Sequence, residues 1–368
     1  MIADPALPPL TIRAVRSIGV EVPMTYALGT SQARITRAPL LLIDLETEEG
    51  ITGQTYLFCY RPSGARALTL LIEDAASLIA GEYVRPVQLA AKLARRFALI
   101  GVTGTVRMAL SGLDAAMWDA LARAAALPLA SMLGGSPRPI RAYNSCGLGL
   151  MTPAAVADEA MRLTERGFKA VKLRLGYPTL KEDLSALKAV REQLGAVIDV
   201  MVDYNQALSL EEAMLRAQAL ASEGITWLEE PIRHDDLAGN AIIAATSKIP
   251  LQLGENFNGV EAMSATVQAR ACHLVMPDLA RIGGITGWMD AAALASAHNI
   301  LMSSHLFPEV SAHLLAATPT AHWLEYVDWG DAILQEPLKI VDGMAIVSDR
   351  PGAGFEWDVA AVERYRMS

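Results

Sequence analysis

Short apolar runs alternate with longer helix-like stretches over most of the chain. Between them, helix-terminal signals recur, such as Thr152-Pro153 for a start, Ser209 with Glu212 for a capping box, and Gly224 for a stop. This alternation predicts a parallel α/β barrel. The segment 306–321 looks short and irregular for a crossover helix. The eight strand-like runs are 140–144, 170–175, 199–204, 225–229, 250–255, 273–278, 300–305 and 322–326.

The residues before this alternation follow a different pattern. Three β-like runs indicate an antiparallel meander, with a polar, turn-rich segment expected between the first two. Three Ala- and Leu-rich stretches then have helical spacing, so the pattern predicts an α+β domain. The strands are expected at 11–22, 39–46 and 51–57, and the helices at 64–81, 86–96 and 103–127.

We therefore expect three parts in the chain. An α+β domain spans 1–133, and the barrel spans 134–326, beginning at the GGSPRP turn. The remaining segment, 327–368, contains two short strand-like runs that cannot form a core alone. We expect it to pack back on the N-terminal domain.

Composition narrows the class of protein. The chain has 368 residues, 52% hydrophobic and 19% charged, which suffices for a barrel of about 250 residues and a further domain. The net charge of −9 and the absence of a basic patch argue against nucleic-acid binding. The three widely spaced cysteines, the lack of a leader-like N-terminus and the lack of long apolar runs favour a cytoplasmic protein with free thiols and no membrane partner.

Three acidic residues recur at equal intervals of 26 residues. Asp203 stands in MVDYN, Glu229 in TWLEEP and Glu255 in LQLGEN, each at the end of a predicted strand. The carboxyl ends of parallel strands meet at one edge, so these carboxylates should lie side by side. Three hard oxygen ligands on neighbouring strands predict a Mg²⁺ site.

The other predicted strands also end in polar residues. Lys172 and Arg174 are two apart on one strand, so both side chains point the same way, and two cations beside a metal would hold an anionic substrate. The alternative is that both cations lie at a strand edge that is exposed to solvent. The remaining strand ends carry Ser145, Asn205, Asp278, His305 and Glu325.

His305 and Asp278 end adjacent predicted strands. Adjacent strands lie about 4.8 Å apart, so the carboxylate can hold one imidazole nitrogen and leave the other facing the barrel mouth. This pairing predicts a general base. A core histidine satisfied by a backbone carbonyl is the alternative.

These motifs resemble the mandelate racemase subgroup of the enolase superfamily, from about residue 11 to 355. The resemblance implies a (β/α)7β barrel with the α+β domain as a cap, one Mg²⁺ per subunit, and an octamer or dimer. It also implies abstraction of the proton α to a carboxylate through an enediolate. The segments that carry it are FKAVKLRLGYP, VDYNQ, TWLEEP, LGEN, MPDLARIGGITGW, MSSHLF and SAHLLAATPTAHWLE.

The resemblance also implies roles for single residues. The metal ligands would be Asp203, Glu229 and Glu255. His305 with Asp278 would be the base dyad, and Glu325 the acid for the substrate carboxylate. Lys172 would be the first lysine of a KxK motif, with Ser145 and Asn205 as nearby polar groups.

Two departures from the family pattern bear on the reaction. Arg174 stands where a racemase has its second lysine, and arginine is a poor proton acceptor because its pKa exceeds about 12. The loop between the first two strands carries Gln32 and Arg34, which would suit a polyhydroxy acid better than an aryl ring. Tyr60, with Phe58, leaves an aromatic wall open as an alternative.

These observations favour a Mg²⁺-dependent dehydratase acting on an acid sugar or another 2-hydroxy acid, with His305 as its base. A racemase or epimerase of a 2-hydroxy acid is the second hypothesis. A non-catalytic carboxylate-binding protein on the same fold is the third, although such a binder would have no need of a base dyad. Zinc hydrolase barrels are set aside, because the first predicted strand does not end in a histidine pair.

Overall fold

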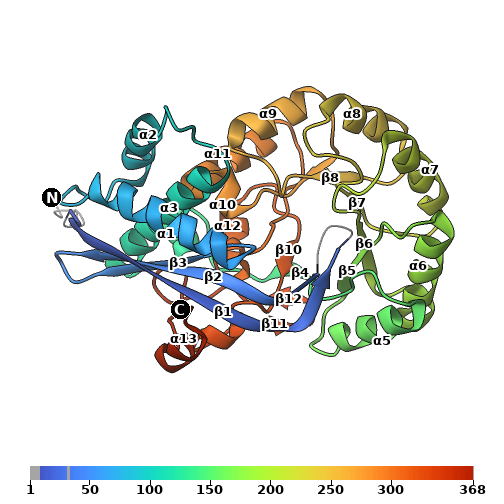
Figure 1. Cartoon of the computed structure of the whole chain (residues 1–368), viewed down its shortest axis with the longest axis horizontal. Coiled ribbons are helices and arrows are strands. Elements are labelled where there is room, and N and C mark those ends of the chain that lie inside the picture. The colour runs from blue at the N-terminus through green and yellow to red at the C-terminus, as the bar shows by residue number, and fades with distance from the viewer. Residues whose placement is uncertain (1–8, 31–33, 368) are drawn as a thin grey trace.

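The computed structural model describes residues 9–30 and 34–367. Its N-terminal domain is an antiparallel meander of three strands covered by helices (Figure 1). The longest helix of this domain packs against the third strand and against the barrel. The elements are β1 (Ile12–Gly29), β2 (Arg34–Thr47), β3 (Thr52–Phe58), α1 (Pro62–Ser77), α2 (Pro86–Arg96), α3 (Gly104–Ala124) and the short α4 (Leu129–Met132).

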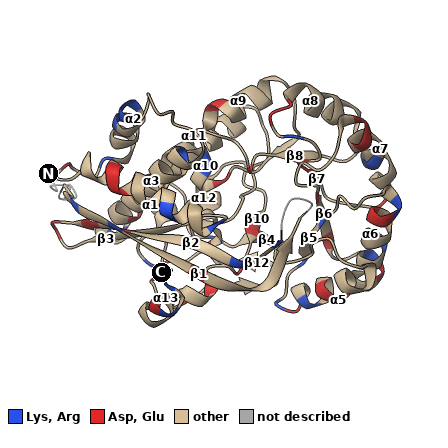
Figure 2. Cartoon of the chain, viewed as in Figure 1, with Lys and Arg blue, Asp and Glu red and all other residues tan. Residues whose placement is uncertain are grey.

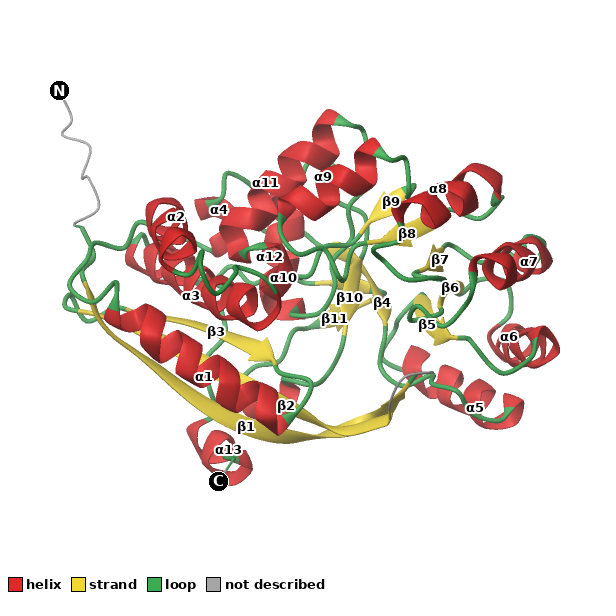
Figure 3. Cartoon of the chain, turned by 45° about the horizontal axis from the view of Figure 1, so that its top comes forward, coloured by secondary structure: helices red, strands yellow, loops and turns green. Residues whose placement is uncertain are grey.

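The first two strands extend beyond the expected ranges. The segment predicted to be a polar turn continues the ladder, with Leu28 opposite Ile35 and Gly29 opposite Arg34 after a register shift. Figures 1 and 3 show this ribbon reaching the barrel near its first strands. There the Leu150 N–H donates to the Gly29 carbonyl (3.3 Å). The prediction of a turn was therefore wrong, because apolar side chains within the segment pack against the barrel mouth.

Parallel strands form the barrel and helices surround them (Figure 3). The last strand pairs with the first and closes the ring. The expected strand at 300–305 is reduced to isolated bridges, in which Met302 joins Val275 and Ala321, and His305 joins Asp278. The strands are β4 (Ile140–Asn144), β5 (Ala170–Arg174), β6 (Asp199–Asp203), β7 (Leu228–Glu229), β8 (Leu251–Leu253), β9 (Leu274–Val275) and β10 (Leu324–Tyr326).

Several barrel helices begin at side-chain caps. Thr179 forms a full capping box with Glu182, and Ser209 accepts from the Glu212 backbone N–H. The helices are α5 (Pro153–Thr164), α6 (Leu180–Leu194), α7 (Leu210–Leu220), α8 (Leu237–Thr246), α9 (Val260–Gln268), α10 (Leu279–Ile282), α11 (Gly284–Ala297) and α12 (Pro308–Ala317).

The segment 306–321 does contain a regular helix, contrary to the sequence-based expectation. The ten residues of α12 start with Pro308 at the first turn, and nine of them are buried. A helix buried on every side shows no amphipathic period, so the pattern gave no sign of it.

The C-terminal segment contacts both the barrel and the N-terminal domain. A short hairpin extends the sheet at β4, Trp357 Nε1 donates to Asp44 Oδ1 (2.9 Å), and the Met367 N–H donates to the Gly19 carbonyl (2.8 Å). Its elements are a 3₁₀ turn (Asp331–Ile333), β11 (Ile340–Val341), β12 (Met344–Ala345) and α13 (Val359–Tyr365).

Acidic and basic residues are interspersed over the outer helices (Figure 2). Within the described residues, no helix combines the length and the apolar character needed to cross a membrane.

Candidate active site

Three carboxylates lie together at the carboxyl ends of β6, β7 and β8. One oxygen from each of Asp203, Glu229 and Glu255 lies within 4.8 Å of the others. Asp203 and Glu229 are buried and Glu255 is partly buried. Burial, only partly offset by Lys172, raises the pKa of the Glu229 carboxyl above its usual range. Three converging oxygen donors whose negative charge is destabilised by burial fit a hard divalent cation such as Mg²⁺.

Lys172 is buried beside this carboxylate cluster. Its ammonium lies 2.7 Å from Glu229 Oε1, 2.8 Å from Glu325 Oε1 and 3.3 Å from Asp203 Oδ2. A fixed positive charge at this point can bind the carboxylate of a substrate next to the metal ligands.

His305 and Asp278 form the predicted pair. The imidazole Nδ1 lies 2.7 Å from Asp278 Oδ2, and the other oxygen of that carboxylate accepts from the backbone N–H groups of Ala280 (2.7 Å) and Arg281 (3.1 Å). Asp278 therefore caps α10 and orients the histidine at once. The free nitrogen, Nε2, lies 3.3 Å from Glu255 Oε2 and lines the cavity described below.

The charge environment of His305 favours its protonated form. Burial disfavours the imidazolium, but Glu325, Glu255 and Asp278 outweigh burial and raise the pKa of His305 to about 9. A cation bound at Glu255 would weaken the contribution of that carboxylate. The arrangement holds a strongly basic imidazole in one orientation.

Glu325 ends β10 on the opposite side of the histidine from Asp278. Its Oε2 accepts from the Leu306 N–H (2.9 Å) and lies 3.8 Å from His305 Nε2. Burial disfavours the carboxylate, but Lys172 and His305 outweigh it and hold the pKa of Glu325 below its usual range. Ser145 also hydrogen-bonds to Glu325.

Arg174 is buried and bound to the loop after β4. Its Nη1 donates to the carbonyls of Gly147 (2.6 Å) and Ser145 (3.2 Å), and its Nη2 donates to the Ser145 carbonyl and Oγ (both 3.2 Å). Its Nε is buried and finds no hydrogen-bond partner among the described residues. The guanidinium thus fixes the loop that carries Ser145, and Arg174 also lines the cavity.

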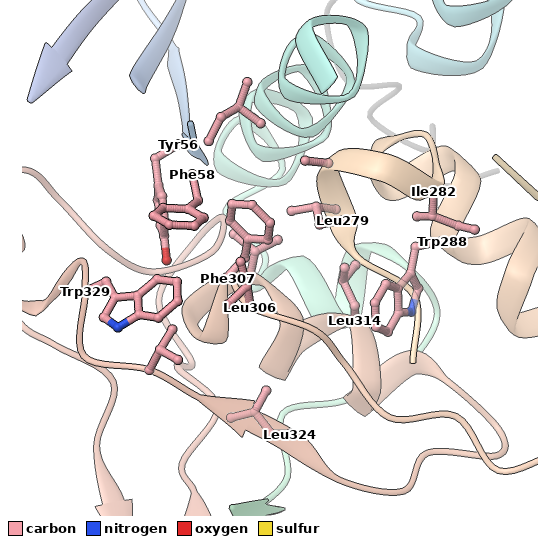
Figure 4. Close-up of a cluster of buried hydrophobic side chains, with 14 of the residues drawn as sticks. Tyr56, Phe58, Leu279, Ile282, Trp288, Leu306, Phe307, Leu314, Leu324 and Trp329 are labelled. Carbon is pink, nitrogen blue, oxygen red and sulfur yellow. The ribbon is translucent and has the colours of Figure 1, made fainter. Parts of the chain in front are cut away.

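A cavity of about 440 Å³ lies between the barrel mouth and the N-terminal domain. One side holds the polar residues described above. The opposite wall is apolar, and in it the ring centroids of Phe58 and Tyr60 are 4.6 Å apart and those of Phe58 and Trp329 are 4.7 Å apart. Figure 4 shows Phe58, Trp329 and Leu306 within a cluster of buried hydrophobic side chains. It consists of Leu28, Ile35, Phe58, Tyr60, Leu306 and Trp329.

Two polar residues were expected from the β1–β2 hairpin. Gln32 lies outside the described residues. Arg34 is exposed and is not among the described residues that line the cavity, so its role as a substrate contact stays a prediction. Side chains alternate between the two faces of a strand, and Ile35, the next residue, lines the cavity instead. Leu28, opposite Ile35, lines it as well.

The structure brings the other predicted site residues together. Ser145, Lys172, Arg174, Asp203, Asn205, Glu255, His305, Glu325 and Tyr60 all line the cavity, with Glu229 and Asp278 directly behind it. Sequence reasoning missed Arg281, Gln206, Arg233 and Trp329 as lining residues. Gln206 follows a strand end closely enough to have been considered. Trp329 gave no such signal because it lies beyond the last strand.

Comparisons with known proteins agree with this geometry. Residues 11–134 match the N-terminal domain of the mandelate racemase/muconate lactonizing enzyme family, and residues 155–361 match the enolase C-terminal domain-like family. A curated relative, the L-talarate/galactarate dehydratase of Salmonella typhimurium, is 31% identical over 88% of this chain and 82% of its own.

Two solved structures are similar over nearly the whole chain. An enolase from the alpha proteobacterium bal199 with bound Mg is 43% identical, with a TM-score of 0.95 over 97% of this chain and 100% of its own. An enolase from Bradyrhizobium complexed with magnesium and mandelic acid is 40% identical, with a TM-score of 0.94 over 99% and 100%. Their metal is the one that the carboxylate donor set fits, and Mg²⁺ is the cofactor. With both domains matched and a carboxylate cluster that can hold the metal, the chain belongs to the mandelate racemase/muconate lactonizing enzyme family, as an enzyme of the mandelate racemase subgroup of the enolase superfamily.

Proposed function

We propose that this enzyme is a dehydratase that removes the α-proton of an acid sugar or related 2,3-dihydroxy carboxylate and eliminates the β-hydroxyl as water. The observation that carries the proposal is the binding of Arg174 to loop carbonyls. At the position of a second base, this guanidinium donates to the carbonyls of Ser145 and Gly147, and arginine side chains are poor proton acceptors. Among the described residues, the site therefore has one well-placed base, His305.

Dehydration needs only that one base. His305 Nε2 takes the α-proton while Asp278 accepts from Nδ1 and stabilises the imidazolium. The protonated histidine then gives its proton to the departing β-hydroxyl. The C–H and C–O bonds break, a C=C bond forms, water leaves, and the enol product tautomerises to a 2-keto-3-deoxy acid.

The remaining polar residues bind and orient the substrate. Lys172 attracts the substrate carboxylate, and Glu325, 2.8 Å from the Lys172 ammonium, helps to hold that ammonium in place. When bound to Asp203, Glu229 and Glu255, Mg²⁺ supplies a Lewis acid that stabilises this charge.

Polar groups in the cavity support a hydroxylated substrate. Asn205 and Gln206 line the cavity and offer amide groups to hydroxyls. The relative from Salmonella typhimurium, a dehydratase of talarate and galactarate, supports the same class of reaction.

A second candidate function is racemisation or epimerisation of a 2-hydroxy acid with an apolar substituent. The apolar wall around Phe58 and Trp329 favours it, as does the mandelic acid bound to the Bradyrhizobium relative. This reaction would require Arg174 or Lys172 to act as a second base on the face opposite His305. Arg174 is poorly suited to that role, and Lys172 is ion-paired with Glu229 and Glu325.

A substrate screen in D₂O separates the two functions. The enzyme is incubated with Mg²⁺ and a panel of mono- and diacid sugars and both mandelate enantiomers. We expect a 2-keto-3-deoxy product from at least one acid sugar, and deuterium exchange from one configuration at C2 only. Exchange from both enantiomers of a 2-hydroxy acid, with no keto product from any sugar, would establish the racemase instead.

A further inference from the structure

We infer that Arg281 is a positioning residue that connects the capping segment 58–60 to the metal ligand Glu255 through Asn256. Arg281 lies within the short helix α10 and lines the cavity, but its side chain contacts neither the carboxylate cluster nor His305 directly. Its guanidinium hydrogen-bonds to a residue of each domain, and it stands outside the catalytic steps proposed above.

On the barrel side, Arg281 fixes the orientation of an amide. Its Nη1 donates to Asn256 Oδ1 (2.6 Å), and Asn256 Nδ2 donates to Glu255 Oε1 (3.0 Å) and Glu230 Oε2 (2.8 Å). A flipped amide would place its oxygen against two carboxylates and its NH₂ group against a guanidinium. Arg281 therefore holds Asn256 in the one orientation that can donate to Glu255.

The amide in turn defines the position of the metal ligand. One oxygen of Glu255 accepts from Asn256, and the other lies 3.3 Å from His305 Nε2. Glu255 is the most exposed of the three carboxylates, so it depends most on such a neighbour to stay in place. Hydrogen bonds from neighbouring side chains commonly orient metal-ligating carboxylates and raise the affinity of the site.

On the cap side, Arg281 holds Tyr60. Its Nη2 donates to the Tyr60 hydroxyl (2.8 Å), and its guanidinium carbon lies 5.2 Å from the centre of the tyrosine ring. The backbone of Tyr60 has a φ of +60°, in the left-handed region that a tyrosine rarely adopts without surrounding contacts. The same ring packs on Phe58, so Arg281 also stabilises the position of the apolar wall of the cavity.

The backbone of Arg281 is anchored as firmly as its side chain. Its N–H donates to Asp278 Oδ1, whose partner oxygen holds His305. The guanidinium thus extends from a fixed point beside the base. The chain of contacts Tyr60–Arg281–Asn256–Glu255 predicts that Mg²⁺ binding and placement of the capping segment favour each other, and linkage makes such an effect reciprocal.

The test measures Mg²⁺ binding without substrate. Isothermal titration of Mg²⁺ into the substrate-free full-length enzyme gives the Kd of wild type, Tyr60→Phe, Arg281→Met and the double variant. We expect each single variant to bind Mg²⁺ at least about fivefold more weakly. The double variant should bind no more weakly than Arg281→Met, because both changes break the same connection.

A matched variant controls for general effects on the capping domain. Tyr83→Phe removes a hydroxyl from an exposed tyrosine of that domain, far from the cavity lining, and should leave the Kd for Mg²⁺ unchanged. An unchanged Kd in Tyr60→Phe would overturn the inference. So would an Arg281→Met enzyme that binds Mg²⁺ normally but has a raised KM, since Arg281 would then bind the substrate directly. The titration involves no substrate, so its result is independent of which reaction the enzyme performs.

Discussion

In the proposed reaction, His305 can act as a base only while Asp278 accepts from its Nδ1. In Asp278→Asn, the asparagine oxygen would still accept from the N–H groups of Ala280 and Arg281, so its NH₂ group would face the imidazole. Nδ1 would then have to accept and Nε2 would carry the proton. We expect kcat to fall by about 10²–10⁴-fold, the range that a positioned general base supplies.

Mg²⁺ binding distinguishes this effect from damage to the site. Asp278 is outside the cluster of three metal-ligating carboxylates, so the Kd of Asp278→Asn for Mg²⁺ should equal that of wild type. A variant with less than a fivefold loss in kcat would contradict the role of Asp278.

The guanidinium of Arg174 stabilises the loop after β4 through its hydrogen bonds to backbone carbonyls. In Arg174→Met, the buried carbonyls of Ser145 and Gly147 would lose their donors. Leaving buried acceptors unpaired costs about 1–3 kcal/mol, so the free energy of unfolding in urea should fall by that amount. Arg16→Met, at an exposed site, should change it by less than about 0.5 kcal/mol. Equal losses in the two variants would show that the loop does not depend on Arg174.

The residues of the site divide into those that the sequence could predict and those that it could not. Asp203, Glu229 and His305 end barrel strands, and the carboxyl ends of such strands must meet, so spacing alone brings them together. Tyr60 and Trp329 come from the capping domain and the C-terminal segment. Their meeting depends on how side chains pack between the domains, which no spacing determines.

At the scale of elements, amphipathic helices and their caps were predictable, and elements with atypical burial were not. Thr152 and Ser209 accept at the helix starts where their sequence context placed them. The helix α12 was missed because it is buried on all sides, and the extension of β1 and β2 was missed because Leu28 and Ile35 gain burial only against the barrel. The hydrophobic pattern of a segment indicates which of its side chains are buried only when one face of the element remains exposed to water.

The junction of α3 and α11 offers a prediction at this scale. Gly284, at the start of α11, has a φ of +72°, and an added Cβ would lie 2.5 Å from Asp114 Oδ2 and 2.8 Å from the Ser111 carbonyl. Asp114 accepts from the N–H (2.8 Å) and hydroxyl (2.6 Å) of Thr286 and so joins the two domains. Gly284→Ala should therefore lower the free energy of unfolding by more than about 2 kcal/mol, from backbone strain and steric overlap together.

Gly50→Ala isolates the backbone contribution. Gly50 has a φ of +83°, and its added Cβ would meet no atom of the described residues within 4 Å. We expect a loss of about 1–2 kcal/mol there, from the left-handed conformation alone. Urea unfolding of both variants gives the difference. If Gly284→Ala loses no more free energy of unfolding than Gly50→Ala, the close packing of α3 on α11 contributes nothing to stability.

At the scale of the whole molecule, the metal site joins three neighbouring barrel strands. Asp203, Glu229 and Glu255 bring three negative charges together at the ends of β6, β7 and β8, and Lys172 offsets only part of this charge. A ligand that binds only the folded state adds RT ln(1 + [L]/Kd) to its stability, about 2.7 kcal/mol at 100 times the Kd. Chelation of Mg²⁺ by EDTA should therefore abolish activity and lower the midpoint of thermal unfolding, and added Mg²⁺ should restore both.

In Glu229→Gln the loss of one charged ligand should remove the response of the midpoint to Mg²⁺, whereas an exposed change such as Glu192→Gln should leave that response intact. An equal response of the wild type and Glu229→Gln to Mg²⁺ would mean that the stabilising ion binds elsewhere.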